Sequence, residues 1–563
     1  MCASFLILGS LPSLVFPQAS VNVSNLDPVY HDIDQLVGQG LVDKIIMGQR
    51  PYSRKEIARI TAEAMRHLSR LEKPLGDSTT SEDKKRALQE RLDYVNGILD
   101  RLKSDYREEL VQLGALEGEK SWYSLHTVEK VEASVLGTNS PAEALPVNNG
   151  LASIDAVINP FVDYREGRHL VEGFNLSLET SHWVRATNYL AFYVRPRFQL
   201  GVTPNGQPND NKAYIQNLYG KLYFKNFELE VGRDNILWGQ GPQTGILLSN
   251  NPRGLDMIKI SNDSPGILPW IFKYLGANKL SFFYSDLGPN QNFPHAYLIG
   301  LKWSLQPLSF MELGFSQILQ SGGEGSPPSS FGKRVGEFFA ISDTDDKNNN
   351  QNVANKMGGF DIRFRIPPAR GLELYGEAIY DDFGDFSSFT DSQFLFKDGS
   401  YLLGIYVPRL INSGKLDFRL EYHHTGVRFY RHGTFTSGLT LNQFILGDNL
   451  GSVAHGLYIS SNWDVNRQNL LTFNAAFESR SGDVWGVAPP FTFVVVQDNP
   501  SENRYRGSVQ WLHRFKAWPM FFRAQMGYER VQNFGFIAGN GRNNFLGEFA
   551  LQINFDHWTQ FSR

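Results

Sequence analysis

The chain has 563 residues and a formal charge of −4, from 54 Lys and Arg against 58 Asp and Glu. This balance gives no basic field of the kind that nucleic-acid binding requires, so nucleic acid is not an expected partner. The single cysteine, Cys2, excludes a disulfide framework, a cysteine-based zinc site and a thiol nucleophile in a chain that has lost its leader. A mean hydropathy of −0.31 excludes a membrane protein built from several spanning helices.

The first 26 residues are uncharged, and they are apolar around Phe5–Leu8. This pattern predicts a secretory signal peptide over residues 1–20, cleaved near Ala19 or Ser20. The stretch lacks the usual basic residues at its start, so a buried hydrophobic segment is the alternative. A chain with such a signal is expected to be secreted.

Residues 27–118 have a helical pattern and predict a small, soluble helical bundle. Start and stop signals occur at Asp27-Pro28, at Gly38 and Gly40, and at Ser53 with Glu56, which form a capping box. An apolar stripe that runs from Leu88 to Leu113, with its members spaced by threes and fours, predicts one long helix. Such a seam is typical of a packed core and not of a cofactor site.

From Ser121 onward the apolar period changes to two, which predicts β-strands. The clearest strands are expected near 309–318, 355–367, 371–381, 399–409, 415–425, 454–462, 468–479, 503–515, 519–531 and 544–555. A hairpin is expected across Lys225-Asn226. The stretch Ser264–Ala277 is longer than a tight turn and is expected to hold a short helix.

The gaps between these strands alternate between about 3–5 and about 12–36 residues. A transmembrane barrel has this asymmetry, with tight periplasmic turns and large external loops, whereas a soluble sandwich has no reason to keep it. The parity predicts external segments at 321–354, 426–453 and 480–502. The periplasmic segments are then 304–308, 368–370 and 463–467.

The fold class predicted for residues 121–563 is an all-β outer-membrane barrel of about 18 antiparallel strands. About 19 candidate strands can be counted, and an even number is chosen because single-chain bacterial barrels have one. The opposite faces of these strands carry charges of both signs, which predict a lumen laced by ion pairs. They are Arg363, Arg365, Glu373, Glu377, Arg419, Glu421, Arg504, Arg506 and Arg523.

Four groups of residues resemble the signature of the Wzi family of capsule-assembly outer-membrane proteins. They are Val29–Asp34 with Arg50–Arg54; Val231–Gly241, followed by Leu248–Asn251 and Leu255–Asp256; Glu373–Glu377 with Asp381–Asp382; and Leu446–Gly447 before Gly451. The structural motif residues among them are Asp234, Trp238, Gly239, Gly241, Ser249, Asn250, Asp256, Glu377 and Asp381. Gln240 stands where the family usually has Pro.

This resemblance implies an 18-stranded barrel with its helical bundle on the periplasmic side. It also implies a lectin-like protein that attaches capsular polysaccharide or exopolysaccharide at the cell surface. The expected partners are that polysaccharide and outer-membrane lipid, and a monomer is expected.

No enzymatic motif stands out in the sequence, and no catalytic residue, metal site or cofactor is predicted. The glycines around Trp238 have the wrong spacing for a phosphate loop. Glu377, Asp381 and Asp382 could pair as glycosidase carboxylates, but carboxylates on strands of a polar lumen are more often ion-pair partners.

The external loop within 425–455 carries the residues predicted to contact polysaccharide: Tyr430, Arg431, His432 and Phe435. Aromatic faces pack on sugar C–H surfaces, and Arg and His donate hydrogen bonds to anionic groups. The alternative for these residues is packing of the loop into the barrel mouth. Two other functions stay open, a general or substrate-selective porin and an enzyme sited in the lumen. The helical bundle favours the polysaccharide tether, because a diffusion pore has no need of one.

Overall fold

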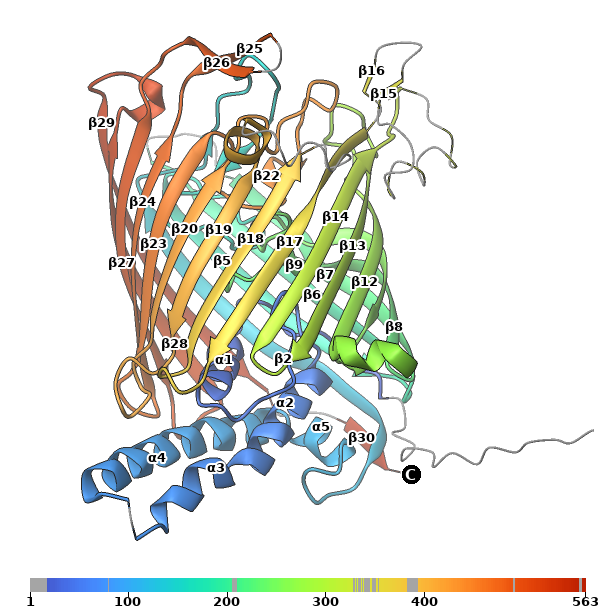
Figure 1. The fold of residues 1–563 in the computed structure, drawn as a ribbon, viewed down its shortest axis with the longest axis vertical. Coiled ribbons are helices and arrows are strands. Elements are labelled where there is room, and N and C mark those ends of the chain that lie inside the picture. Colours follow the sequence, from blue (N-terminus) through green and yellow to red (C-terminus); the bar gives the residue numbers. More distant parts are fainter. Residues whose placement is uncertain are drawn as a thin grey trace, which may run out of the picture.

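The computed structural model describes residues 18–78, 80–204, 210–327, 330, 332, 336, 338, 345–346, 351–352, 354–381, 393–489, 492–555 and 559–562. Within this part of the chain, a tall antiparallel barrel stands on a layer of short helices (Figure 1). Residues 1–17 of the predicted leader and most of the predicted loop 321–354 lie outside the described residues. Ala19 and Ser20, where cleavage is predicted, are buried against the barrel.

The barrel has eighteen strands, and each pairs with the next along the chain until the last closes on the first. This confirms the predicted fold class and strand number. The strands are β2 (Ser121–Thr138), β5 (Gly173–Arg185), β6 (Leu190–Val202), β7 (Asp210–Phe224), β8 (Phe227–Asp234), β10 (Leu255–Asn262), β12 (Ala277–Asp286), β13 (Tyr297–Leu308), β14 (Met311–Ser321), β17 (Ala354–Ile366), β18 (Leu372–Asp381), β19 (Ser400–Val407), β20 (Phe418–Thr425), β23 (Ala454–Asp464), β24 (Asn469–Arg480), β27 (Glu502–Arg514), β28 (Met520–Gln532) and β29 (Gly541–Asn554).

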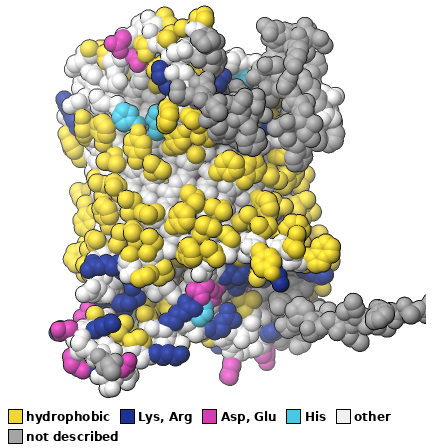
Figure 2. Space-filling model, in the orientation of Figure 1, with side chains coloured by type: hydrophobic (Ala, Val, Ile, Leu, Met, Phe, Trp, Pro, Cys, Tyr) yellow, Lys and Arg dark blue, Asp and Glu magenta, His cyan; other side chains and the backbone are white. Residues whose placement is uncertain are grey.

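The two faces of the barrel wall differ as the period of two predicts. On β17 and β18, Phe360 and Leu374 point outward and are exposed, whereas Arg363 and Glu373 point inward and are buried. Hydrophobic side chains form a broad band around the outer face (Figure 2). A closed ladder with an apolar outer band satisfies the backbone inside a bilayer.

The tight turns lie at the same end of the barrel as the helices (Figure 1). One predicted periplasmic segment is wrong in detail, because residues 304–308 belong to β13 and the turn is Ser309-Phe310. The long gap after β10 contains a 3-10 helix, η2 (Trp270–Leu275), which confirms the short helix expected there.

The helices are α1 (Val29–Gly38), α2 (Arg54–His67), α3 (Ser69–Glu72), the 3-10 helix η1 (Lys73–Leu75), α4 (Glu82–Asp105) and α5 (Arg107–Gln112). Ser53 caps α2, accepting a hydrogen bond from the Glu56 N–H at 3.0 Å. The single helix predicted over the Leu88–Leu113 stripe is wrong, because non-helical Tyr106 (φ −120°, ψ 27°) separates α4 from α5. Tyr106 is buried under the Arg54 guanidinium, 4.9 Å from its ring centroid. No described helix is long and apolar enough to cross a bilayer.

The N-terminal segment enters the barrel base instead of lying wholly beneath it. The His31 imidazole of α1 contacts the Asp464 carboxylate at 2.9 Å, and Gln35 donates to the Tyr406 hydroxyl at 3.2 Å. Met47 and Gly48 donate their N–H groups to Glu312 on β14 at 2.9 and 2.8 Å. These contacts fix the N-terminal segment against the inner wall.

Candidate functional site

A loop from the end of the barrel opposite the helices meets the N-terminal segment inside the lumen. Residues 235–254 leave β8 at Asp234 and return to the wall at Leu255. On the way, β9 (Leu237–Trp238) forms an antiparallel ladder with β1 (Gln49–Arg50). We call residues 235–254 the inward loop. Since β1 comes from the end of the barrel that carries the helices, the two ends of the barrel are joined through its interior.

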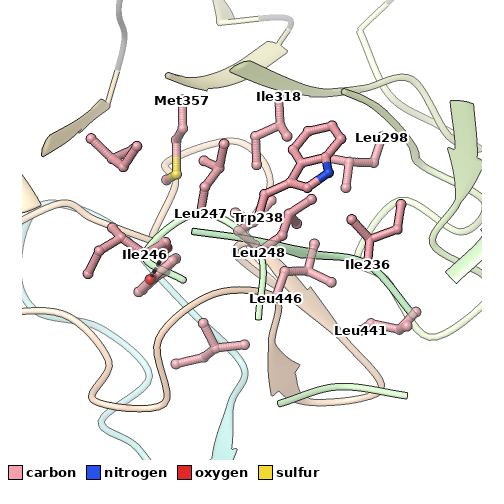
Figure 3. Packing of buried hydrophobic residues seen from close by; sticks show 14 of the residues in the cluster. Ile236, Trp238, Ile246, Leu247, Leu248, Leu298, Ile318, Met357, Leu441 and Leu446 are labelled. Atoms are coloured by element: carbon pink, nitrogen blue, oxygen red, sulfur yellow. Dashed lines mark hydrogen bonds between the residues drawn. The ribbon is translucent and has the colours of Figure 1, made fainter. Parts of the chain in front are cut away.

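Trp238 lies at the centre of the hydrophobic cluster that the inward loop builds (Figure 3). Its ring packs against Phe283 at 5.1 Å between centroids, and its side chain is only 2% exposed. Figure 3 shows Leu247, Leu248 and Leu446 around it, with Ile318 and Met357 reaching in from the wall. Trp238 is therefore a core residue of the plug, as we call the inward loop together with β1, inside the barrel.

Gly239 is required by the close approach of the inward loop to the wall. A Cβ atom at this position would lie 2.6 Å from a carboxylate oxygen of Glu377, and the backbone has φ +159°. That carboxylate accepts hydrogen bonds from the N–H groups of Gln240 and Ile246 at 2.6 and 2.9 Å. Gly241 is as confined, because a Cβ would lie 2.6 Å from the Thr244 methyl group. Glu377 therefore clamps a backbone turn, and Asp382, its suggested glycosidase partner, lies outside the described residues.

Gln240 is the residue whose importance the sequence did not reveal. Its amide donates to Asp361 at 2.6 Å, and its side-chain oxygen accepts from Arg363 at 2.8 Å. These partners belong to an ion-paired layer on the inner wall, in which Lys302 pairs with Asp361 and Arg363 with Glu373. Proline, usual here in the family, has no side chain that could make these bonds.

Three further motif residues hold the inward loop to its neighbours. Asp234 accepts from Asn22 at 2.6 Å, and Ser249 donates to the Gly447 carbonyl at 2.5 Å. Asn250 donates to the Tyr164 carbonyl at 3.0 Å. Asp381 is buried at the external end of β18. Asp256 differs, because it points outward and pairs with Arg233 at 2.6 Å on the barrel exterior.

The four residues predicted to contact polysaccharide are buried, so the expectation that they are exposed is wrong. Tyr430 is fully buried; its hydroxyl donates to the Ile246 carbonyl and accepts from the Asp448 N–H. Phe435 is also fully buried and packs edge-on against Phe293, at 5.3 Å between centroids. Both residues fasten loop 426–453 to neighbouring loops, which is the alternative weighed for them.

Arg431 is a buried cation held only by neutral groups. It donates to the Ser452 hydroxyl and to the carbonyls of Val147 and Pro146, at 2.5, 2.9 and 2.7 Å. Within the described chain, no carboxylate lies at ion-pair distance from this guanidinium, and burial lowers its pKa to about 10. The positive charge at the barrel mouth is therefore not neutralised locally.

His432 shapes the same loop. Its Nδ1 accepts hydrogen bonds from the N–H groups of Thr434 and Phe435 at 3.1 and 3.0 Å, which requires that nitrogen to be unprotonated. Burial, and then the nearby charge of Arg428, lower the pKa of His432 to about 4. The imidazole is accordingly neutral at physiological pH and serves as a turn cap.

Exposed polar side chains, most of them amides and one the Asp155 carboxylate, lie on the same loop as these buried residues and on the loops that contact it. Asn292 donates to the Thr434 carbonyl at 3.0 Å, and Gln443 donates to Asp155 at 3.2 Å. We call this surface the amide tract; its members are Asn148, Asp155, Asn290, Asn292, Thr434 and Gln443, all at least partly exposed. Three loops, 139–172, 287–296 and 426–453, contribute to it. Side-chain amides can donate and accept at once, as sugar hydroxyls do.

A chamber of about 470 Å³ lies beside the plug, against the wall formed by β23, β24, β27, β28 and β29. Its lining is rich in paired charges; Arg506 pairs with Glu478, and Arg523 pairs with Glu132 at 3.0 Å. The predicted ion-paired lumen is confirmed by these contacts and by the Arg504–Glu529 pair at 3.2 Å.

Three residues of the N-terminal segment have a spacing that a metal ion could use: Asp43, which lies between α1 and α2, and Glu63 and His67 on α2. Each already has other partners. Arg70 binds the Asp43 carboxylate at 2.6 Å, and Arg59 binds Glu63 at 2.8 Å. Because two guanidinium groups already bind these carboxylates, the cluster is better explained as a set of ion pairs that stabilises α2 than as a cation site.

A closed 18-stranded barrel with an apolar outer band, whose lumen is entered by the inward loop and the N-terminal segment, defines an outer-membrane barrel with an internal plug. The family model for the capsule assembly protein Wzi matches residues 158–546, more than half of the chain. The chain belongs to this family, and it is a capsule-related protein of the Gram-negative outer membrane.

The fold is similar to the solved structure of Wzi from Escherichia coli. That protein is described as an outer membrane protein involved in group 1 capsule assembly and as a carbohydrate-binding β-barrel. The TM-score is 0.59 at 16% identity, over 96% of this chain and all of that one. A protein of the cps region of Klebsiella pneumoniae, described as an uncharacterized 55.8 kDa protein, is 27% identical over 179 residues. This match spans 31% of the chain and about a third (34%) of that protein.

Proposed function

We propose that this protein holds capsular polysaccharide or exopolysaccharide at the cell surface, in the manner of a lectin and without catalysing a reaction. The E. coli structure supports the proposal, since that barrel is described as carbohydrate-binding. The polysaccharide would bind at the external mouth, on the amide tract. The observation that carries the assignment is Arg431, an unneutralised buried cation whose loop also carries Thr434 and Gln443 of the exposed amide tract.

In this proposal, the buried residues of loop 426–453 support the binding surface instead of touching the sugar. Tyr430 and Phe435 lock the loop to its neighbours, and His432 caps its turn. The pre-ordered loops would lose little conformational entropy on binding, which favours affinity. The wall ladder closes within one chain, which supports a monomer in outer-membrane lipid.

The test is binding of the purified protein to surface polysaccharide from its own organism. We expect the double variant Asn292→Ala, Gln443→Ala to bind at least tenfold more weakly than the natural protein. The matched control is Asn474→Ala, which removes an exposed amide inside the lumen. If neither the natural protein nor the control binds this polysaccharide, the proposed function is wrong.

A substrate-selective porin is the second candidate, and the chamber beside the plug favours it. Paired arginines and carboxylates in a lumen can select a solute by charge. The plug argues against it, because β1 and β9 join periplasmic and external segments across the interior. Single-channel recording separates the two candidates.

A further inference from the structure

The segment that links β10 to β12 carries an unusual group of exposed apolar side chains. We call residues 264–276 the rim segment; it contains β11 (Gly266–Ile267) and η2 (Trp270–Leu275). Trp270 is 85% exposed, Ile271 70% and Tyr274 75%, and Ile267 and Phe272 are each more than half exposed. Such a concentration of large apolar side chains on one short segment marks an interaction surface.

The rim segment is firmly held, so its exposure is built into the fold. Asn226, in the turn between β7 and β8, donates to the Ser264 carbonyl at 2.8 Å and accepts from the Ser264 N–H at 3.1 Å. β11 pairs with the start of β12, where Asn278 donates to the Gly266 carbonyl at 2.7 Å. Gly276 ends the helix at φ +71°, and a Cβ there would lie 1.9 Å from the Gln306 carbonyl oxygen.

The rim segment continues the bilayer-facing surface of the barrel. Outward side chains of the adjoining strands are exposed and apolar, including Ile258 and Ile260 on β10 and Leu280 on β12. Phe224 and Phe227 flank the Asn226 turn and are exposed at the same level. In Figure 1 the green helix η2 projects sideways at the lower right of the barrel, level with the periplasmic turns. Figure 2 shows hydrophobic side chains beside basic ones in that part of the view.

The chemistry of the rim segment suits a lipid headgroup region. Lys273 is the one charged residue in 264–276, and its amine lies 5.2 Å from the Tyr274 ring centroid. Trp and Tyr prefer the boundary between hydrocarbon and water, and Lys there reaches lipid phosphates. A periplasmic protein partner would more often be matched by a mixed polar rim, as at ordinary interfaces.

We propose that the rim segment is a membrane-anchoring foot that inserts into the periplasmic leaflet of the outer membrane, with Lys273 on lipid phosphate. The foot extends the membrane contact beyond the strand wall at the link between β10 and β12. It would therefore set the depth and tilt at which the barrel sits. This inference depends on the barrel lying in a bilayer and not on polysaccharide binding.

The test uses the full chain in a Cys2→Ser background, with single cysteines carrying a nitroxide label. The positions are Ile271→Cys and Ile267→Cys in the rim segment, Ile260→Cys on the bilayer face of β10, and Arg86→Cys on α4. The side chain of Arg86 is 85% exposed on the periplasmic side. The purified variants are placed in vesicles of phosphatidylethanolamine and phosphatidylglycerol, with no other protein present.

The readout is the accessibility of each label to oxygen, which concentrates in lipid, relative to a water-soluble nickel chelate. We expect the oxygen-to-nickel ratio at 271 and 267 to approach that at 260 and to exceed that at 86 several-fold. If both rim positions match position 86, the segment lies in water and the proposal is overturned, leaving a protein partner as its occupant. Heat-modifiable migration of every variant verifies that each barrel is folded.

Discussion

The carboxylate of Glu377, on the barrel wall, accepts a hydrogen bond from the backbone N–H of Gln240 in the inward loop, at 2.6 Å. A second bond, from the Ile246 N–H, makes Glu377 a clamp on both sides of the Gly-rich turn. Charge-assisted bonds of this kind are stronger than neutral ones. The wall thereby fixes the loop on which the external surface rests.

The first prediction concerns this clamp. Glu377→Ala should destabilise the plug by about 2–5 kcal/mol, because two buried N–H groups lose their acceptor. Urea unfolding in lipid vesicles and protease access to residues 235–254 measure the effect. Asp256→Ala is the matched control, since its exposed pair with Arg233 contributes only about 0–1 kcal/mol. Equal stability of the two variants would show that Glu377 does not hold the inward loop.

The barrel could be predicted from sequence because its determinants are local. Polar and apolar residues alternate along each strand and so separate its inner face from its outer face, as Arg363 and Phe364 illustrate. The alternation of short and long gaps between strands orients the hairpins. The turn at Ser309-Phe310 was misplaced since β13 continues with the same alternation up to Leu308. The break at Tyr106 was missed because it depends on a tertiary contact with Arg54.

The site was predicted less well, because the composition of a loop does not show whether the loop is buried. Tyr430 and Phe435 resemble exposed binding residues in sequence, but partners far away in the chain, at Ile246 and Phe293, bury them. The ladder between β1 and β9 joins segments nearly 190 residues apart and has no local signal. The one signal in the sequence was Gln240, which stands where the family usually has Pro and which bonds to Asp361 and Arg363 on the inner wall.

A pH dependence is expected from His31. Burial alone would lower its pKa, but Asp464 and then Asp417 more than offset this and raise it to about 9, above the ordinary 6.5. The charged imidazole therefore stabilises α1 fully below about pH 6.5, and this contribution is lost as the pH rises through about 9. Protease access to α1 should increase over that window. The dependence should vanish in His31→Gln and persist in His455→Gln; its persistence in the first variant would refute the assignment.

Conductance tests the closure of the lumen. The intact protein should show little single-channel conductance in planar bilayers. Removal of residues 27–118 should raise it, because that segment supplies β1 and the contacts to Glu312. Glu312→Ala should give a smaller increase, with Asp100→Ala, at an exposed site on α4, as control. Large steady conductance of the natural protein would favour the porin.

Orientation can be tested with single cysteines in a Cys2→Ser background. A membrane-impermeant maleimide on intact cells should label Gln443→Cys in the external loop. Arg467→Cys, whose side chain is 59% exposed in the turn after β23, should be labelled only after permeabilisation. Labelling of Arg467→Cys on intact cells would show that the barrel has the opposite orientation in the membrane.

The last prediction concerns Arg431 and an anionic polysaccharide. Arg431 acts through its buried charge and through the loops that it holds, and not by touching the sugar. Arg431→Ala should therefore weaken binding of an anionic polysaccharide by roughly tenfold, which is about 1.4 kcal/mol. Arg431→Lys should recover part of the affinity, because the charge is kept while the bonds to Val147 and Pro146 are altered. Arg530→Ala is the matched control, since it removes an exposed cation from the same end of the barrel, on β28. In cells, Arg431→Ala should shed polysaccharide into the medium while synthesis continues, because a tether makes none. If folded Arg431→Ala binds and retains polysaccharide as well as Arg530→Ala does, the binding surface is not the one carried by loop 426–453.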